Sequence, residues 1–187
     1  MSAGLIHTHS IKPEIVISKQ SSAININKDF LNILSGGYNN LLASFFWITT
    51  LLESDLEHYK KKDLNSWLYL RFALITNLDP LFIGAYQFGG KYLNIVKDDL
   101  EGSRNIFKAG LKQFPDNYDL LFNYGFLLAF EIKDYNAAVP IYTKVLNFPE
   151  TPEYIKSLIP KIIYMQDKSL ESAYSMLHEM YKNEPKD

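Results

Sequence analysis

The chain has 187 residues, no cysteine, and 19 basic against 21 acidic residues, which gives a net charge of −2. The near-neutral balance excludes a polybasic nucleic-acid binder and a charge-driven disordered chain. The lack of cysteine excludes disulfides, thiolate metal sites and a cysteine nucleophile. Aromatic residues make up 14 % of the chain, and so much ring surface needs a core, a groove or a partner.

Residues 1–26 are predicted to form an extended arm that precedes a helical domain over residues 27–187. Pro13 and the polar run at residues 19–22 disfavour a stable helix in the arm. The first residues lack a basic residue followed by an apolar run, so no cleavable signal peptide is expected. The longest near-apolar run, residues 41–52, is shorter than the roughly 20 residues of a membrane span, and no span is expected.

The helical domain is predicted to begin with a short helix over residues 27–34 that ends at Gly36-Gly37. A long helix over residues 38–61 follows, and its apolar face makes it a candidate cap for the domain. The next helix spans residues 67–75 and contains Trp67 and Phe72.

From this helix onward, a spacing of 35 residues brings the chain into register with itself. Gly90 matches Gly125, and three further sets match: Phe72, Phe107 and Tyr142; Asp99, Asp134 and Ser169; Ser103, Ala138 and Ala173. Each unit is therefore expected to contain two helices. The second helices are predicted to be capped by Asp99, Asp134 and Ser169, and the first helices by Asp79, Asp116 and Thr151.

The matched positions predict close packing between helices. Glycine inside a helix costs about 1 kcal/mol against alanine, so Gly90 and Gly125 indicate that a neighbouring element approaches closely. The set of small residues that includes Ser103 would lie on the facing helix, opposite the glycines. The set of rings that includes Phe107 would fill the space between units. Pro140 and Pro160 are expected to bend their helices.

These residues resemble a known repeat family. Tyr124-Gly125, then residues 134–138 (Asp-Tyr-Asn-Ala-Ala) and Tyr142, look like a tetratricopeptide repeat. The resemblance covers residues 45 to 183 and implies an all-α fold, a right-handed superhelical solenoid of about three and a half to four stacked antiparallel helix pairs. The period is one residue longer than the usual ~34, and Pro160 departs from the glycine of the earlier units.

A period of 35 also suits the pentatricopeptide repeats, which read RNA. Such proteins need basic phosphate contacts, and no basic column recurs at the 35-residue spacing here. We therefore expect no nucleic-acid partner.

Motifs for catalysis, nucleotide binding and metal binding are not found in the sequence. The four histidines are His7, His9, His58 and His178, and only the first two lie close together. We expect no enzyme activity, no cofactor and no metal.

The family resemblance implies a concave groove lined by the first helix of each unit. Anchoring the register on Gly90 and Gly125 assigns its residues: Gln87, Lys91, Asn94, Phe122, Phe126, Phe130, Lys161 and Tyr164. The three phenylalanines share one helical stripe because they are spaced by four. This stripe has three interpretations: core packing, a groove for an amphipathic helix or extended peptide of another protein, or an autoinhibitory resting place for the arm.

The leading interpretation of function is a non-enzymatic scaffold or adaptor, of bacterial type, that binds a partner protein in the groove. One alternative is a structural assembly subunit that forms its complex through the outer face or the capping helices. A fainter similarity of residues 31–47 and 78–80 to membrane-tethered bacterial repeat proteins suggests an envelope or secretion accessory protein. A cytoplasmic location is slightly favoured, with a periplasmic or tethered one as the alternative if an anchor has been removed.

Overall fold

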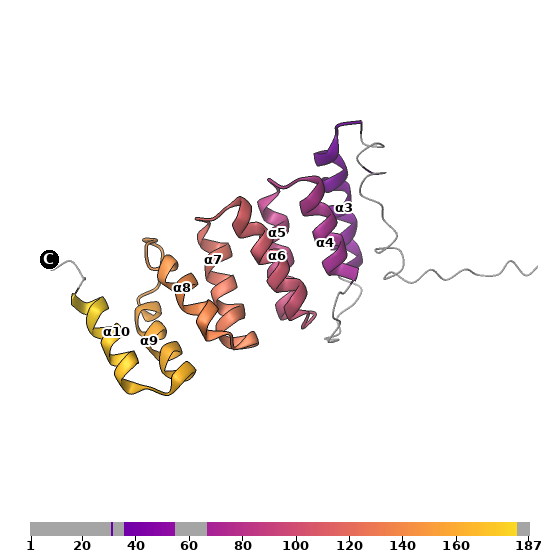
Figure 1. The fold of residues 1–187 in the computed structure, drawn as a ribbon. Coiled ribbons are helices and arrows are strands. Elements are labelled where there is room, and N and C mark those ends of the chain that lie inside the picture. Colours follow the sequence, from indigo (N-terminus) through magenta and orange to yellow (C-terminus); the bar gives the residue numbers. More distant parts are fainter. Residues whose placement is uncertain (1–30, 32–35, 55–66, 183–187) are drawn as a thin grey trace, which may run out of the picture.

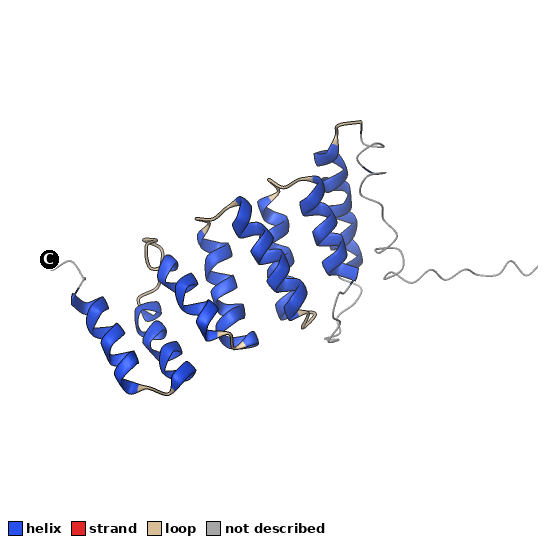
Figure 2. Cartoon of the chain, viewed as in Figure 1, coloured by secondary structure: helices blue, strands red, loops and turns tan. Residues whose placement is uncertain are grey.

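A computed structural model describes residue 31 and residues 36–54 and 67–182. The predicted arm, most of the helix expected over residues 27–34, and residues 55–61 of the predicted long helix lie outside these ranges. Within them every regular element is a helix (Figure 2), and the all-α prediction is confirmed for this part of the chain. The elements are α3 (Asn39–Ser54), α4 (Trp67–Leu78), α5 (Ile83–Ile95), α6 (Leu100–Gln113), α7 (Tyr118–Phe126), η1 (Leu127–Ile132), α8 (Tyr135–Val145), α9 (Tyr154–Asp167) and α10 (Leu170–Lys182).

The helices follow one another in a row, with α3 at one end and α10 at the other (Figure 1). Each helix packs against its neighbours in the sequence, and α7 contacts α5 as well as α6. No helix of the described residues is long and apolar enough to cross a membrane.

The second helix of each pair, in α5–α6, α7–α8 and α9–α10, begins in the same way. A residue with positive φ comes first: Asp98 (56°), Lys133 (63°) and Lys168 (55°). The side chain of the next residue accepts a hydrogen bond from the backbone N–H three positions later, over 2.8 Å at Asp99, 3.2 Å at Asp134 and 3.1 Å at Ser169. These three predicted caps are confirmed, and the loop geometry repeats at the predicted spacing.

The caps predicted for the first helices are wrong. The Asp79 carboxylate accepts from the Leu81 N–H in the turn before α5, which starts at Ile83 without a side-chain cap. The cap of α7 is Asn117, one residue after the predicted Asp116. The Thr151 hydroxyl donates back to the Val145 carbonyl instead of capping α9. In each case the chain completes a turn between two helix pairs before the helix begins, which local capping patterns do not reveal.

A neighbouring helix approaches the repeated glycines closely, as predicted, and the group that meets each glycine is an aromatic ring. A methyl group added at Gly90 would lie 2.5 Å from the Phe107 ring, and one at Gly125 would lie 3.1 Å from the Tyr142 ring. Each ring therefore covers the glycine of its own pair. Phe107 also packs across the boundary between pairs, because its ring centroid is 6.0 Å from that of Tyr124 in α7.

Two of the three small residues predicted on the facing helices are buried as expected, whereas Ala173 is half-buried. Ser103 is fully buried, and its hydroxyl donates to the Gly90 carbonyl over 2.8 Å. Ala138 is fully buried as well. Pro140 and Pro160 lie inside α8 and α9, and both helices continue past them.

The Asp99 cap is fully buried, so its loss should lower the free energy of unfolding more than the loss of an exposed cap. Replacing Asp99 with alanine is expected to lower the free energy of unfolding by about 1–2 kcal/mol, because the Gly102 N–H loses its acceptor. Urea denaturation followed by circular dichroism measures the change. The matched variant Ser169→Ala removes a more accessible cap and should cost less; equal losses would contradict the role assigned to burial.

Candidate functional site

Two of the polar residues predicted for the groove, Gln87 and Lys91, connect two successive first helices. The Gln87 amide donates to the Asn117 side-chain oxygen over 3.3 Å, and the Lys91 ammonium pairs with the Asp119 carboxylate at 3.2 Å. Both contacts bridge α5 to the start of α7. Asn94, the third polar residue of this set, is only 9 % exposed. Lys91 and Gln87 therefore contribute to packing between pairs.

The predicted phenylalanine stripe divides into two parts. Phe122 is half-buried, and its ring lies 5.6 Å from the Tyr118 ring and 6.3 Å from the Tyr142 ring, centroid to centroid. Phe126 and Phe130 are each 40 % exposed, and their ring centroids are 5.1 Å apart. Core packing thus describes Phe122, whereas the other two rings form a pair at the surface.

The Tyr142 side chain beside Phe122 carries no charge. The side chain is 1 % exposed, and burial raises the pKa of its phenol. The hydroxyl therefore stays neutral at physiological pH, and no charge develops beside Phe122.

Phe130 lies in a π-helical segment, η1, which the apolar spacing predicts as ordinary α-helix. The backbone N–H of Lys133 donates to the Leu128 carbonyl five residues earlier. The wider turn changes the direction of the side chains within it relative to α7. Segments of this kind occur frequently at functional sites.

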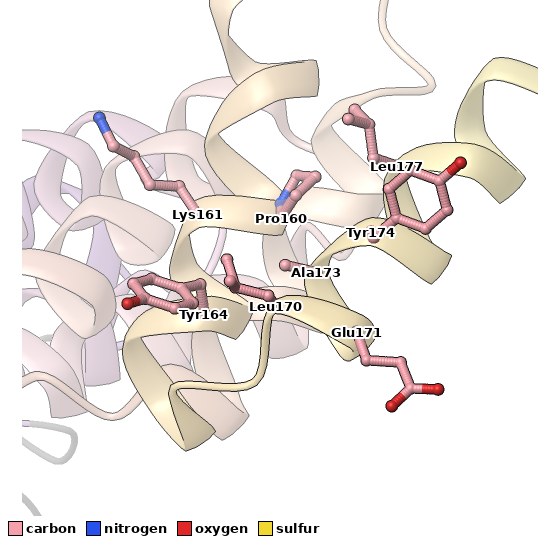
Figure 3. Close-up of a pocket in the computed structure, with 8 residues that line it drawn as sticks. All are labelled: Pro160, Lys161, Tyr164, Leu170, Glu171, Ala173, Tyr174 and Leu177. Carbon is pink, nitrogen blue, oxygen red and sulfur yellow. The ribbon is translucent and has the colours of Figure 1, made fainter.

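The remaining two predicted residues, Lys161 and Tyr164, lie on α9 and are both exposed. They line a pocket of about 620 Å³ between α9 and α10, whose wall also includes Pro160, Leu170, Tyr174 and Leu177 (Figure 3). The wall is mainly apolar, with Lys161 and Glu171 extending away from the other labelled side chains in Figure 3.

Two exposed residues were missed by the sequence prediction. Ile95 is 61 % exposed at the end of α5, and Met165 is 45 % exposed on α9. Both match Phe130 at the 35-residue spacing, so an exposed apolar residue occupies the same place in three successive first helices. We call Ile95, Phe130 and Met165 the apolar column. The sequence prediction placed Asn94 and Tyr164 in the groove, each one residue before a member of the column. The sequence contained a signal for the column, because all three of its members are apolar.

In the part of the chain that the structure describes, no group of three or more histidine, aspartate or glutamate side chains comes together to hold a metal ion.

Comparisons with known proteins identify no relative: no protein-family model matches the sequence, and no curated protein matches it.

Proposed function

We propose that the chain is a tetratricopeptide-like helical scaffold, without enzymatic activity, that binds an apolar helix or extended peptide of another protein along its first helices. The observation that carries this proposal is the apolar column, with Phe126 beside it. Four large apolar side chains, each at least 40 % exposed, occur on consecutive first helices, and three of them recur at the 35-residue period. Exposed apolar groups in such a series are typical of interaction sites.

The chemistry of the surface defines the partner. Burying one such side chain fully is worth roughly 1.5–3 kcal/mol, so contacts at several repeats can hold a peptide without a charged anchor. Lys91 is paired with Asp119 and is half-exposed, which makes a clamp for a terminal carboxylate less favourable. An amphipathic helix or extended strand whose apolar residues meet successive repeats fits this surface.

The exposed ring pair provides the test. Replacing Phe126 and Phe130 together with lysine is expected to abolish partner capture while leaving the helix content unchanged, since both rings are partly solvated already. Phe122 is left intact because its ring supports Tyr118 and Tyr142. Capture is measured by affinity purification with quantitative mass spectrometry, and folding by circular dichroism.

A matched control separates a local effect from added charge. Leu81→Lys/Thr143→Lys adds the same two charges at exposed positions outside the column and should keep the partner bound. A partner retained by Phe126→Lys/Phe130→Lys, or lost equally from the control, would refute the proposed site. Whether the arm of residues 1–26 covers this surface stays a prediction, because the arm lies outside the described residues.

A further inference from the structure

The last helix pair exposes positions that the earlier pairs bury. Leu177 in α10 matches Phe107 and Tyr142 in the 35-residue register; each of those rings is 1 % exposed, whereas Leu177 is 48 % exposed. Tyr164 in α9 matches Asn94 and Ala129, which are 9 % and 3 % exposed, and is itself 41 % exposed. The face that the inner pairs bury is therefore open at this end of the row.

In the inner pairs a following first helix covers this face. The helix α7 packs against both α5 and α6, and Phe107 of α6 meets Tyr124 of α7. Beyond α9 and α10, the corresponding place is the pocket of about 620 Å³ shown in Figure 3. Its walls include Leu170 and Tyr174, which are 75 % and 69 % exposed. An additional apolar helix would therefore fit against the exposed surface of α9 and α10.

The opposite end of the row offers such a helix. On α3 the exposed side carries Leu41, Phe45, Ile48 and Leu52, each more than half exposed. Their spacing of four, three and four is the seam spacing of helices that pack against other helices. The run from Asn39 to Leu52 contains no charged residue, so burying it desolvates no charge.

We propose that the protein associates head to tail, with α3 of one molecule packing into the groove between α9 and α10 of the next. The two surfaces lie at opposite ends of the row (Figure 1), so they meet only between molecules. The contact resembles the inner junctions, where a first helix covers the preceding pair. Because the two surfaces differ, the association is heterologous, and each added molecule leaves one surface of each kind for the next.

Two variants of the full chain, each blocking one surface, test this directly. The head variant Phe45→Lys/Ile48→Lys blocks α3, and the tail variant Tyr174→Lys/Leu177→Lys blocks the groove; all four residues are at least 48 % exposed. Sedimentation velocity over about 1–100 µM measures the mass. The wild type is expected to grow with concentration to twice the monomer mass and beyond, and each variant alone to remain monomeric.

The decisive result is the mixture. The tail variant keeps its α3 and the head variant keeps its groove, so equal amounts of the two should form a one-to-one complex that grows no further. Asn40→Lys and Ser175→Lys, at exposed positions beside the two surfaces, should associate like the wild type. A wild type that stays monomeric, variants that do not combine, or one variant that still self-associates would each overturn the proposal. These residues are not those of the apolar column, so the result is independent of partner capture.

Discussion

Replacing Phe107 with alanine is expected to lower the free energy of unfolding by about 3–5 kcal/mol, the largest loss we expect from a single substitution. The ring is 1 % exposed, lies against Gly90 of α5, and meets Tyr124 of α7. Its removal leaves a cavity where three helices meet. In a row in which each pair depends on its neighbours, such a loss weakens two contacts at once.

Urea denaturation of wild type and variant, followed by circular dichroism, measures this loss. Phe126→Ala is the matched control, because it deletes the same ring at a position that is 40 % exposed. The control should cost far less than Phe107→Ala. Similar losses for the two variants would show that Phe107 does not hold the row together.

The second large effect on stability is expected from replacing Gly90 with alanine. The added methyl group would lie 2.5–2.8 Å from three atoms of the Phe107 ring, and the ring is enclosed on its other sides. Overpacking of this kind costs about 1–3 kcal/mol, whereas the helix propensity of alanine returns about 1 kcal/mol. We expect a net loss of stability, measured as a lower urea midpoint.

Gly125 provides the internal comparison, because the same methyl group there would lie 3.1–3.2 Å from the Tyr142 ring. Gly125→Ala should therefore be close to neutral. Shortening the ring position with Phe107→Leu should cost less in the Gly90→Ala background than in the wild type, because the clash is relieved. A Gly90→Ala variant as stable as the wild type, or additive losses in the double variant, would contradict the packing described above.

The period allowed much of the fold to be predicted from the sequence. Asp99, Asp134 and Ser169 act locally, through a hydrogen bond within one helical turn, so their caps can be recognised without a structure. Gly90 could also be interpreted, because an unfavourable residue kept inside a helix needs a packing reason. The starts of the first helices could not be predicted, since the turns between pairs depend on how the pairs pack.

The burial of the predicted groove residues could not be derived from the register alone. Phe126 and Phe130 are exposed as a groove requires, but Phe122 and Asn94 point into packing contacts that only the three-dimensional arrangement decides. The π-helical segment shifts the side chains around Phe130, and no feature of the apolar spacing predicts it. Ile95 and Met165 could have been predicted, because the sequence has an apolar residue at this position in three successive units.

Site-specific photo-crosslinking tests directly whether a partner protein binds at the apolar column. A photoreactive phenylalanine analogue placed at position 126 keeps an aromatic ring at the surface, and the same analogue at exposed Lys108 on α6 serves as the reference. We expect one protein to crosslink from position 126 and not from position 108. Crosslinking from position 108 alone, or the same products from both positions, would contradict it.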